Sequence, residues 1–238
     1  MTRRRWIADT WTSTTATLTG EQAAHLARVL RATPGQIYDI VAGGFLYRAE
    51  ITSVQPGEVL FALREELETE TSLPLHLLLA VFKFDHMEWA IEKATELGVD
   101  RITPILARRT EKHLSQAAAK RTERWRRIAL ESSKQSRRTT IPAIAEPAVL
   151  KSALENATEP VRLLLSETEQ ETTIASALSG ETAFPGYALA IGPEGGWTAE
   201  EMDLFVAHKW QPVTLGPRIL RAETAAISAI AILSSHLI

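Results

Sequence analysis

Cysteine is absent from this sequence of 238 residues. The absence excludes disulfides, thiolate nucleophiles, zinc–thiolate centres and iron–sulfur clusters, and it fits a reducing compartment such as the cytoplasm. The six histidines do not stand at metal-ligand spacings, so we expect no bound metal.

Long apolar runs are also missing. No run reaches the roughly 18 residues that are needed to cross a bilayer. The basic start, with Arg3, Arg4 and Arg5, leads into polar residues and not into the apolar segment of a secretory or twin-arginine signal. We therefore expect no membrane partner and a cytoplasmic location.

The overall composition is ordinary, but charge is unevenly distributed. Hydrophobic residues make up 45% and charged residues 23%, which predicts a folded globular chain and excludes a mainly disordered or collagen-like one. Residues 101–138 hold twelve Lys and Arg against three acidic residues, a local charge of +9 in a chain of net charge −3. Because clustered cations neutralise phosphates and release counterions, this stretch favours nucleic-acid contact over a merely solvated helix face.

The first part of the chain predicts a small β-rich domain. Strands are expected at 36–41, 45–51 and 58–63, with glycine-containing turns between them and one helix at 21–30. An acidic, turn-prone stretch then precedes Pro74. We place a domain boundary there, with a first domain at 1–72 and a second at 73–238.

The second part alternates strands and helices. Strands are expected at 75–81, 99–106, 161–165, 187–191 and 212–215. Helices are expected after Asp85 and at 116–137, 171–178, 199–209 and 222–235. Asp85 with Glu88, and Thr198 with Glu201, have the spacing of capping boxes. This order predicts an α/β domain with a mostly parallel sheet that is covered on both faces.

Two glycine-proline loops follow the last two strands, at 192–196 and 216–218. Ligands of open parallel sheets bind beyond the carboxyl ends of the strands, and glycine lets them approach backbone N–H and C=O groups. The loops therefore predict one backbone-lined pocket. By contrast, residues 82–86 after the first strand hold no glycine and no Walker A sequence occurs, which excludes NAD and nucleoside-triphosphate sites.

These loops also carry a specific resemblance. The runs 191–196 and 215–225, together with 92–99, 127–138 and 25–35, resemble the RsmE family of SPOUT methyltransferases over almost the whole chain. The resemblance implies S-adenosylmethionine as cofactor and methylation of N3 of one uridine in 16S ribosomal RNA, as free RNA or in the small ribosomal subunit. Lys134 and Arg137 depart from the usual family pattern and make the basic helix more positive.

The resemblance implies a fold class as well. It implies a small PUA-like β-barrel domain that binds RNA, followed by an α/β SPOUT domain with a mostly parallel sheet and a C-terminal trefoil knot. It also implies a homodimer. Independently of the resemblance, the expected helix at 222–235 is too apolar to face water on all sides, which predicts partial burial in a dimer interface.

For the cofactor, the resemblance implies that the knot loops enclose it with Leu165, Ser166, Ile191, Gly192, Pro193, Glu194, Gly195, Leu215, Gly216, Ile219, Leu220 and Arg221. Neutral uridine N3 is a poor nucleophile, so its proton must be lost. Arg218 or Arg221 could stabilise the deprotonated ring by charge. Glu194 or Glu223 could instead accept the proton, although we expect Glu194 to tie its own loop together, and Glu223 could be only a first-turn acid favoured by the helix dipole.

RNA contact is expected from basic side chains in both domains: Arg3, Arg5, Arg28, Arg31, Arg124, Arg127, Lys134 and Arg138. Trp125 or Trp197 could stack on a base that has left its stack, although tryptophans are more often core residues. Two alternatives stay open. One is an RNA-binding module without catalysis, which would not need an enclosed pocket at the glycine loops. The other is a related SPOUT enzyme with another RNA target, such as a ribose 2′-hydroxyl or a guanine.

Overall fold

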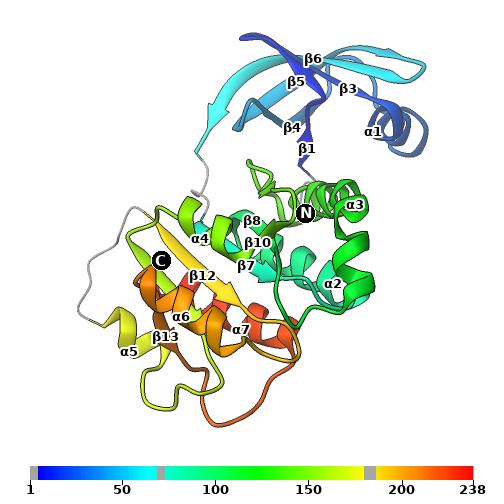
Figure 1. Cartoon of the computed structure of the whole chain (residues 1–238). Helices are drawn as coiled ribbons and strands as arrows, with labels where there is room; N and C mark the ends of the chain where they lie inside the picture. The colour runs from blue at the N-terminus through cyan, green and yellow to red at the C-terminus, as the bar shows by residue number, and fades with distance from the viewer. Residues whose placement is uncertain (1–4, 69–72, 180–185, 238) are drawn as a thin grey trace. The chain divides into compact units, whose positions relative to one another are not determined.

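The structure is a computed structural model that describes residues 5–68, 73–179 and 186–237 (Figure 1). It divides into two compact units. The first is Met1–Thr71 with Ser133–Thr140, and the second is Ser72–Ser132 with Ile141–Ile238. Each unit has its own hydrophobic core, and each is described separately below.

The first unit is built on a six-stranded sheet in the order β1-β4-β5-β6-β3-β2. All neighbouring strands pair antiparallel except β1 and β4, which are parallel. The strands are β1 Trp6–Ile7, β2 Thr10–Trp11, β3 Thr15–Thr19, β4 Ile37–Ala42, β5 Phe45–Gln55 and β6 Glu58–Leu67. The largest buried side chains on this sheet are Trp6, Leu18, Ile40, Ile51 and Phe61.

The predicted end of the last strand of this unit was wrong. β6 continues to Leu67, through part of the acidic stretch that was predicted as a turn. Cross-strand ion pairs allow this, since Arg48 pairs with Glu65 at 2.8 Å and Arg64 pairs with Glu50 at 2.9 Å.

The predicted helix 21–30 is also irregular. It consists of a short α-helix, α1 (Gly20–Ala24), followed by the π-helical turn η1 (His25–Val29). Leu26 is fully buried, whereas Val29 and Leu30 are exposed. The wider π turn shifts the residues after Leu26 away from the face that a regular helix would bury.

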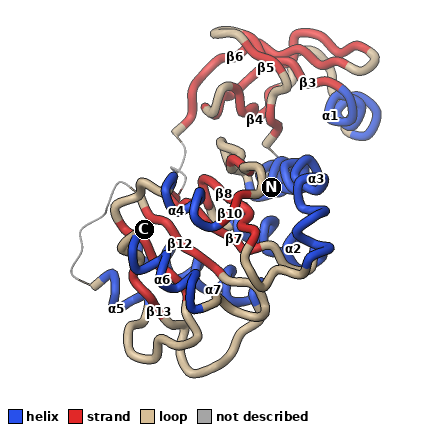
Figure 2. Tube along the Cα trace, in the orientation of Figure 1, coloured by secondary structure: helices blue, strands red, loops and turns tan. Residues whose placement is uncertain are grey.

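The second unit contains a seven-stranded parallel sheet, in which β10-β8-β7-β12-β11-β13 form the main path and β9 pairs with β8. In Figure 2 its strands are red and the helices beside them are blue. The strands are β7 Leu73–Ala80, β8 Val99–Leu106, β9 Ala143–Ile144, β10 Ala148–Val149, β11 Val161–Leu165, β12 Tyr187–Ile191 and β13 Gln211–Val213. The helices are α2 Phe84–Glu96, α3 Lys112–Ser136, α4 Leu150–Asn156, α5 Ile174–Leu178, α6 Ala199–Ala207 and α7 Ala222–Leu237. The predicted α/β class with a parallel sheet is confirmed.

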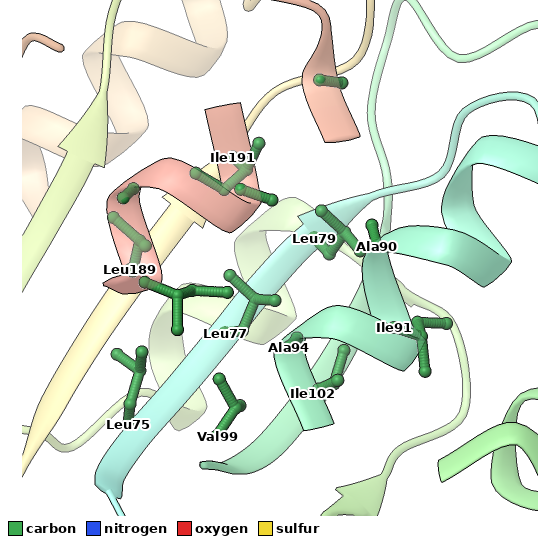
Figure 3. Close-up of a cluster of buried hydrophobic side chains, with 14 of the residues drawn as sticks. Leu75, Leu77, Leu79, Ala90, Ile91, Ala94, Val99, Ile102, Leu189 and Ile191 are labelled. Atoms are coloured by element: carbon green, nitrogen blue, oxygen red, sulfur yellow. The ribbon is translucent and has the colours of Figure 1, made fainter. Parts of the chain in front are cut away.

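Both faces of this sheet are covered, because successive side chains of a strand point to opposite faces. Leu75, Leu77 and Leu79 of β7 pack with α2, α3, α5 and α7 in one cluster, part of which Figure 3 shows. Leu78 of β7 packs with α4 and α6 in a second cluster on the other face. This double burial explains why β7 reads as a continuous apolar run.

The helix boundaries confirm one predicted capping box and correct the other. Thr198 and Glu201 cap α6 reciprocally. In α2, however, the N-cap residue is Lys83, without a side-chain cap hydrogen bond, and Asp85 lies inside the first turn. The N-cap thus lies two residues earlier than predicted, and Glu88 pairs with Arg124 instead of Asp85.

The apolar side chains of α7 are largely used inside this unit. Ala226, Ala229, Ile230 and Leu233 are fully buried in the cluster with α2 and α5, while Ile232 is exposed. Burial within the chain thus accounts for most of the apolar surface on which the prediction of a dimer interface rested.

Candidate functional site

The candidate site lies at the carboxyl edge of the parallel sheet. The main strands run in one direction, so their carboxyl ends share an edge. Three neighbouring strands, β12, β11 and β13, end there at Ile191, Leu165 and Val213. The residues that were predicted to bind a cofactor lie at the ends of these three strands or just after them. The fold therefore brings the three segments to adjacent positions.

The loop after β12 is held by a turn and by a side chain from another loop. The N–H of Gly196, at φ +70°, donates to the carbonyl of Pro193 at 2.8 Å. Arg109, which follows β8, donates from Nη1 to the carbonyl of Gly195 at 2.5 Å. A Cβ on Gly195 would lie 3.3 Å from Cδ of Arg109, and one on Gly192 would lie 3.1 Å from Nε1 of Trp197. Close approach therefore explains Gly192 and Gly195, and the positive φ explains Gly196.

The loop after β13 is shaped by Thr214. Its hydroxyl accepts from the N–H of Gly216 at 3.1 Å, and its own N–H donates to the carbonyl of Thr172 at 2.8 Å. Gly216 has φ +104°, and a Cβ built there meets no atom within 4 Å. The backbone at this glycine thus borders open space, in which a ligand can contact it directly.

The predicted pocket residues of this second loop differ in exposure. Leu215 and Leu220 are half-buried, whereas Ile219 is 85% exposed. Arg218 and Arg221 are also exposed. Ile219 therefore forms no apolar wall within the single chain, and the two guanidinium groups are open to a substrate.

Glu223 and His86 meet where α7 and α2 begin. The Glu223 side chain is 3% exposed, and Oε1 lies 3.5 Å from Nδ1 of His86. Its other oxygen, Oε2, is buried and has no hydrogen-bond partner among the described residues. The His86 side chain is 32% exposed, and its Nε2 lies 3.8 Å from Oδ2 of Asp85. Sequence reasoning missed His86, and its only signal was its place just beyond the first strand of the sheet.

Glu201 joins α6 to the loop after β8. It is buried, with Oε2 accepting from the N–H of Thr198 at 2.9 Å and Oε1 accepting from the N–H of Arg108 at 2.8 Å. Next to it, the backbone N–H of Glu200, the Thr198 side chain and the positive charges of Arg108 and Arg109 hold the pKa of Glu200 below its usual range. Arg108 and Arg109 thus lie beside the carboxylates of Glu200 and Glu201 at this edge of the sheet.

The basic helix α3 is partly neutralised by this unit's own acids. Arg124 forms a bidentate pair with Glu88 at 2.6 and 2.7 Å. Arg126 pairs with Glu146 at 2.9 Å. Arg127 is exposed, whereas Lys134 is only 8% exposed. Of the expected RNA contacts on this helix, Arg124 and Arg127 are exposed, and Arg124 is engaged by Glu88.

The other expected RNA contacts belong to the first unit. Arg28 and Arg31 are exposed on and after η1. Arg5 donates to the carbonyl of Arg137, and Arg138 donates to Oγ1 of Thr140 at 3.3 Å. Arg3 lies outside the described residues.

The two tryptophans that were considered for base stacking are packed within the second unit. Trp125 is fully buried, and its ring centroid lies 6.1 Å from that of Phe84. Trp197 is half-buried against Phe205 at 4.9 Å. Trp125 is therefore a core residue, as its position on the apolar face of α3 predicts.

A separate polar cluster lies near the amino end of β7. His76 Nε2 is 2.8 Å from Oγ1 of Thr103, and Nδ1 is 3.1 Å from Oε1 of Glu159. Arg101 donates to the same oxygen at 2.7 Å. Burial alone would raise the pKa of Glu159, but the hydrogen bonds from His76 and Arg101 and the charge of His76 lower it to about 2. This cluster is structural, since it lies away from the carboxyl edge.

Within the described ranges, no cluster of three or more His, Asp or Glu residues could hold a metal ion. No helix among those residues is both long and apolar enough to span a membrane.

Comparison with known proteins identifies the class that this architecture represents. A family model described as an RNA methyltransferase domain matches residues 69–234, and one described as an RNA methyltransferase PUA domain matches residues 18–63. The fold and the edge loops are thus those of an RNA methyltransferase with an N-terminal PUA-like β domain.

Individual relatives narrow this class. Ribosomal RNA small subunit methyltransferase E of Synechocystis sp. is 36% identical over 220 residues, covering 91% of this chain and 72% of the relative. The protein of the same name from Bacillus subtilis is 31% identical, covering 92% and 90%. A crystal structure of the Neisseria gonorrhoeae protein of that name, bound to S-adenosylmethionine, matches with a TM-score of 0.83 at 28% identity, covering 99% and 98%. The chain belongs to this family, the RsmE family of ribosomal RNA methyltransferases.

Proposed function

We propose that this chain transfers a methyl group from S-adenosylmethionine to N3 of a uridine in 16S ribosomal RNA of the small ribosomal subunit. The observation that carries the proposal is the convergence of three loops at the carboxyl edge, after β11, β12 and β13. Two of these loops contain glycines that close contacts or a positive φ require. Family members of the same fold bind this cofactor.

The edge loops suit the cofactor chemically. Backbone amides and carbonyls at 192–195 and 215–220 would read the adenine edge, and Ile191, Leu215 and Leu220 would supply apolar contact. Gly216 leaves room for a ligand against the backbone. When bound, the cofactor supplies an electrophilic methyl group on a sulfonium sulfur.

The residues around the loops fit the needs of the acceptor. The exposed guanidinium groups of Arg218 and Arg221 would stabilise the negative charge of a uracil that has lost its N3 proton. The carboxylate of Glu223 is buried by this chain's own packing, so the uracil ring of the substrate cannot reach it. In this proposal Glu223 orients the more accessible His86, and the imidazole accepts the proton.

Three finer features belong to the same proposal. The C-terminal part of the second unit forms a trefoil knot, the enzyme is a homodimer, and it acts in the cytoplasm, where ribosomal RNA is found. The family membership supports all three. The exposed Arg28, Arg31 and Arg127 would contact RNA phosphates.

Nucleoside analysis of 16S ribosomal RNA from cells that lack this chain tests the proposal. We expect 3-methyluridine to disappear and to return when the wild-type gene is restored, but not when an Arg218→Ala/Arg221→Ala variant is supplied. Loss of a different modified nucleoside would indicate a related enzyme with another RNA target. Unchanged RNA, together with no heat of binding for S-adenosylmethionine, would favour an RNA-binding module.

A further inference from the structure

An open hollow of about 390 Å³ lies on the first unit, whereas the edge loops that the proposed function uses belong to the second unit. It lies between β2, the residues that follow β2 and the turn that joins β4 to β5. Trp11, Thr12, Ser13, Gly43, Phe45 and Tyr47 line it. All of these residues are within the described part of the chain.

Two large aromatic side chains are exposed at this hollow. Trp11 is 55% exposed and Phe45 is 54% exposed, whereas Trp6 and Phe61 of the same unit are buried in its core. Phe45 and Tyr47 lie two positions apart on β5, so they point to the same side of the strand. Burying these rings would be favourable, because exposed aromatic surface is costly in water and offers stacking faces.

The Trp11 ring is held in place by the backbone beneath it. Gly43 has φ +62°, and a Cβ at that position would lie 2.9 Å from Nε1 of Trp11. Any other residue at 43 would therefore push the ring aside. The indole thus packs against the Gly43 backbone on one face, and this contact restricts its movement on that side.

The polar groups at the hollow suit a nucleobase and not a phosphate. No Lys or Arg is among its lining residues, so it offers no cation to a phosphate. The hydroxyl groups of Ser13 and Tyr47, which line the hollow, can hydrogen-bond to the edge of a base. The volume is near the lower end for small-ligand pockets, which fits one base better than an extended peptide.

We propose that this hollow receives one unstacked base of the substrate RNA, which stacks on Trp11 and Phe45. This inference rests on the proposed function, because it takes its ligand from the RNA substrate. It adds a second point of base recognition, outside the site of methyl transfer. Stacking on aromatic side chains tolerates any base, so the hollow serves affinity and register more than sequence choice.

Equilibrium binding of a 16S RNA fragment that contains the target uridine tests the hollow. Trp11→Ala and Phe45→Ala should each weaken binding by about five- to hundredfold, as expected for one lost base–aromatic stack. The dependence of affinity on salt should keep its wild-type slope, because no phosphate contact is removed. Trp11→Phe should retain most of the affinity. Val29→Ala, which truncates an exposed apolar residue outside the hollow, should retain all of it.

A scan of single abasic positions in the RNA completes the test. At one RNA position, removal of the base should weaken binding by the wild-type protein and leave the affinity of the Trp11→Ala variant unchanged. Wild-type affinity in both alanine variants would overturn the proposal, as would the absence of any such position. A defect seen only with whole ribosomal subunits would also overturn it and indicate a protein ligand. Heat of cofactor binding and turnover at saturating RNA should be unchanged in both variants, so failure of the hollow is distinguishable from failure of the proposed function.

Discussion

The guanidinium of Arg109 donates a hydrogen bond to the carbonyl of Gly195 at 2.5 Å, and this contact joins the loops of two strands that are not neighbours. In the sheet, β7 lies between β8 and β12. The hydrogen bond therefore spans the end of β7 and holds the loop after β12 to the loop after β8. Arg109 is in this respect a positioning residue for the proposed cofactor pocket.

Replacing Arg109 by alanine should raise the dissociation constant for S-adenosylmethionine about five- to tenfold, since a hydrogen bond from a charged group is lost. Isothermal titration measures this change. The matched control is Arg108→Ala, because Arg108 contacts Glu201 through its backbone N–H and its side chain is exposed. Equal affinities in the two variants would contradict the positioning role of Arg109.

Two glycine substitutions should act by different physical causes. Gly216→Ala meets no atom but must hold φ +104°, so we expect about 1–2 kcal/mol of lost stability in urea unfolding. Gly192→Ala places Cβ 3.1 Å from Trp197, so we expect a displaced indole, seen as altered fluorescence, and weaker cofactor binding. Gly186→Ala is the control, because its Cβ would meet atoms only at ordinary contact distances from 3.6 Å. A loss of stability for Gly186→Ala as large as that for Gly216→Ala would contradict the strain argument.

His86→Ala should lower kcat by about a hundredfold or more if the imidazole accepts the N3 proton. The KM values for RNA and cofactor should change less than twofold. The kcat of the variant should rise with pH more steeply than that of the wild type, because hydroxide then replaces the missing base. His113→Ala, at an exposed histidine, should behave as wild type. A variant with wild-type kcat and pH profile would assign the proton to another acceptor.

The free energy of unfolding at acid pH should depend on the pKa of Glu159. Because the folded-state pKa is about 2 and the ordinary value is 4.5, the charged carboxylate stabilises the fold above pH 4.5. That stabilisation is lost as the pH falls from 4.5 to 2, and it amounts to about 3 kcal/mol. Glu159→Gln should therefore be less stable than wild type at pH 7 by about this amount, with the difference vanishing near pH 2. Glu155→Gln, at an exposed position, should show no such convergence.

The sequence predicted the layout of the second unit well, for a physical reason. Strands that are buried on both faces are continuous apolar runs, and the helices between them carry clear local signals. The predicted strand 187–191 matches β12 exactly in its bounds, and the capping box of Thr198 and Glu201 is present. The short strands β9 and β10 and the helix α4 were not predicted, because elements of two to seven residues have little periodicity.

What escaped prediction depends on contacts between distant residues. Arg109 contacts Gly195, which is 86 positions away in the sequence. His86 contacts Glu223, which is even farther away in the sequence. No local pattern marks such pairs. The hollow at Trp11 and Phe45 escaped for the same reason, since its rings come from separate strands and share it only after the sheet has formed. The cofactor loops could be predicted because each is a continuous motif.

The pairing of β7 with β12 has a consequence for biosynthesis. These strands lie at the centre of the sheet, with Leu77 opposite Leu189, yet more than a hundred residues separate them in the chain. At about 5–20 residues per second, β7 waits roughly 6–22 s during translation before its partner has been made. During that interval β7 can pair with β8 and pack against α2, but its other edge has no partner, and an unpaired apolar strand edge is a site for wrong pairing between chains.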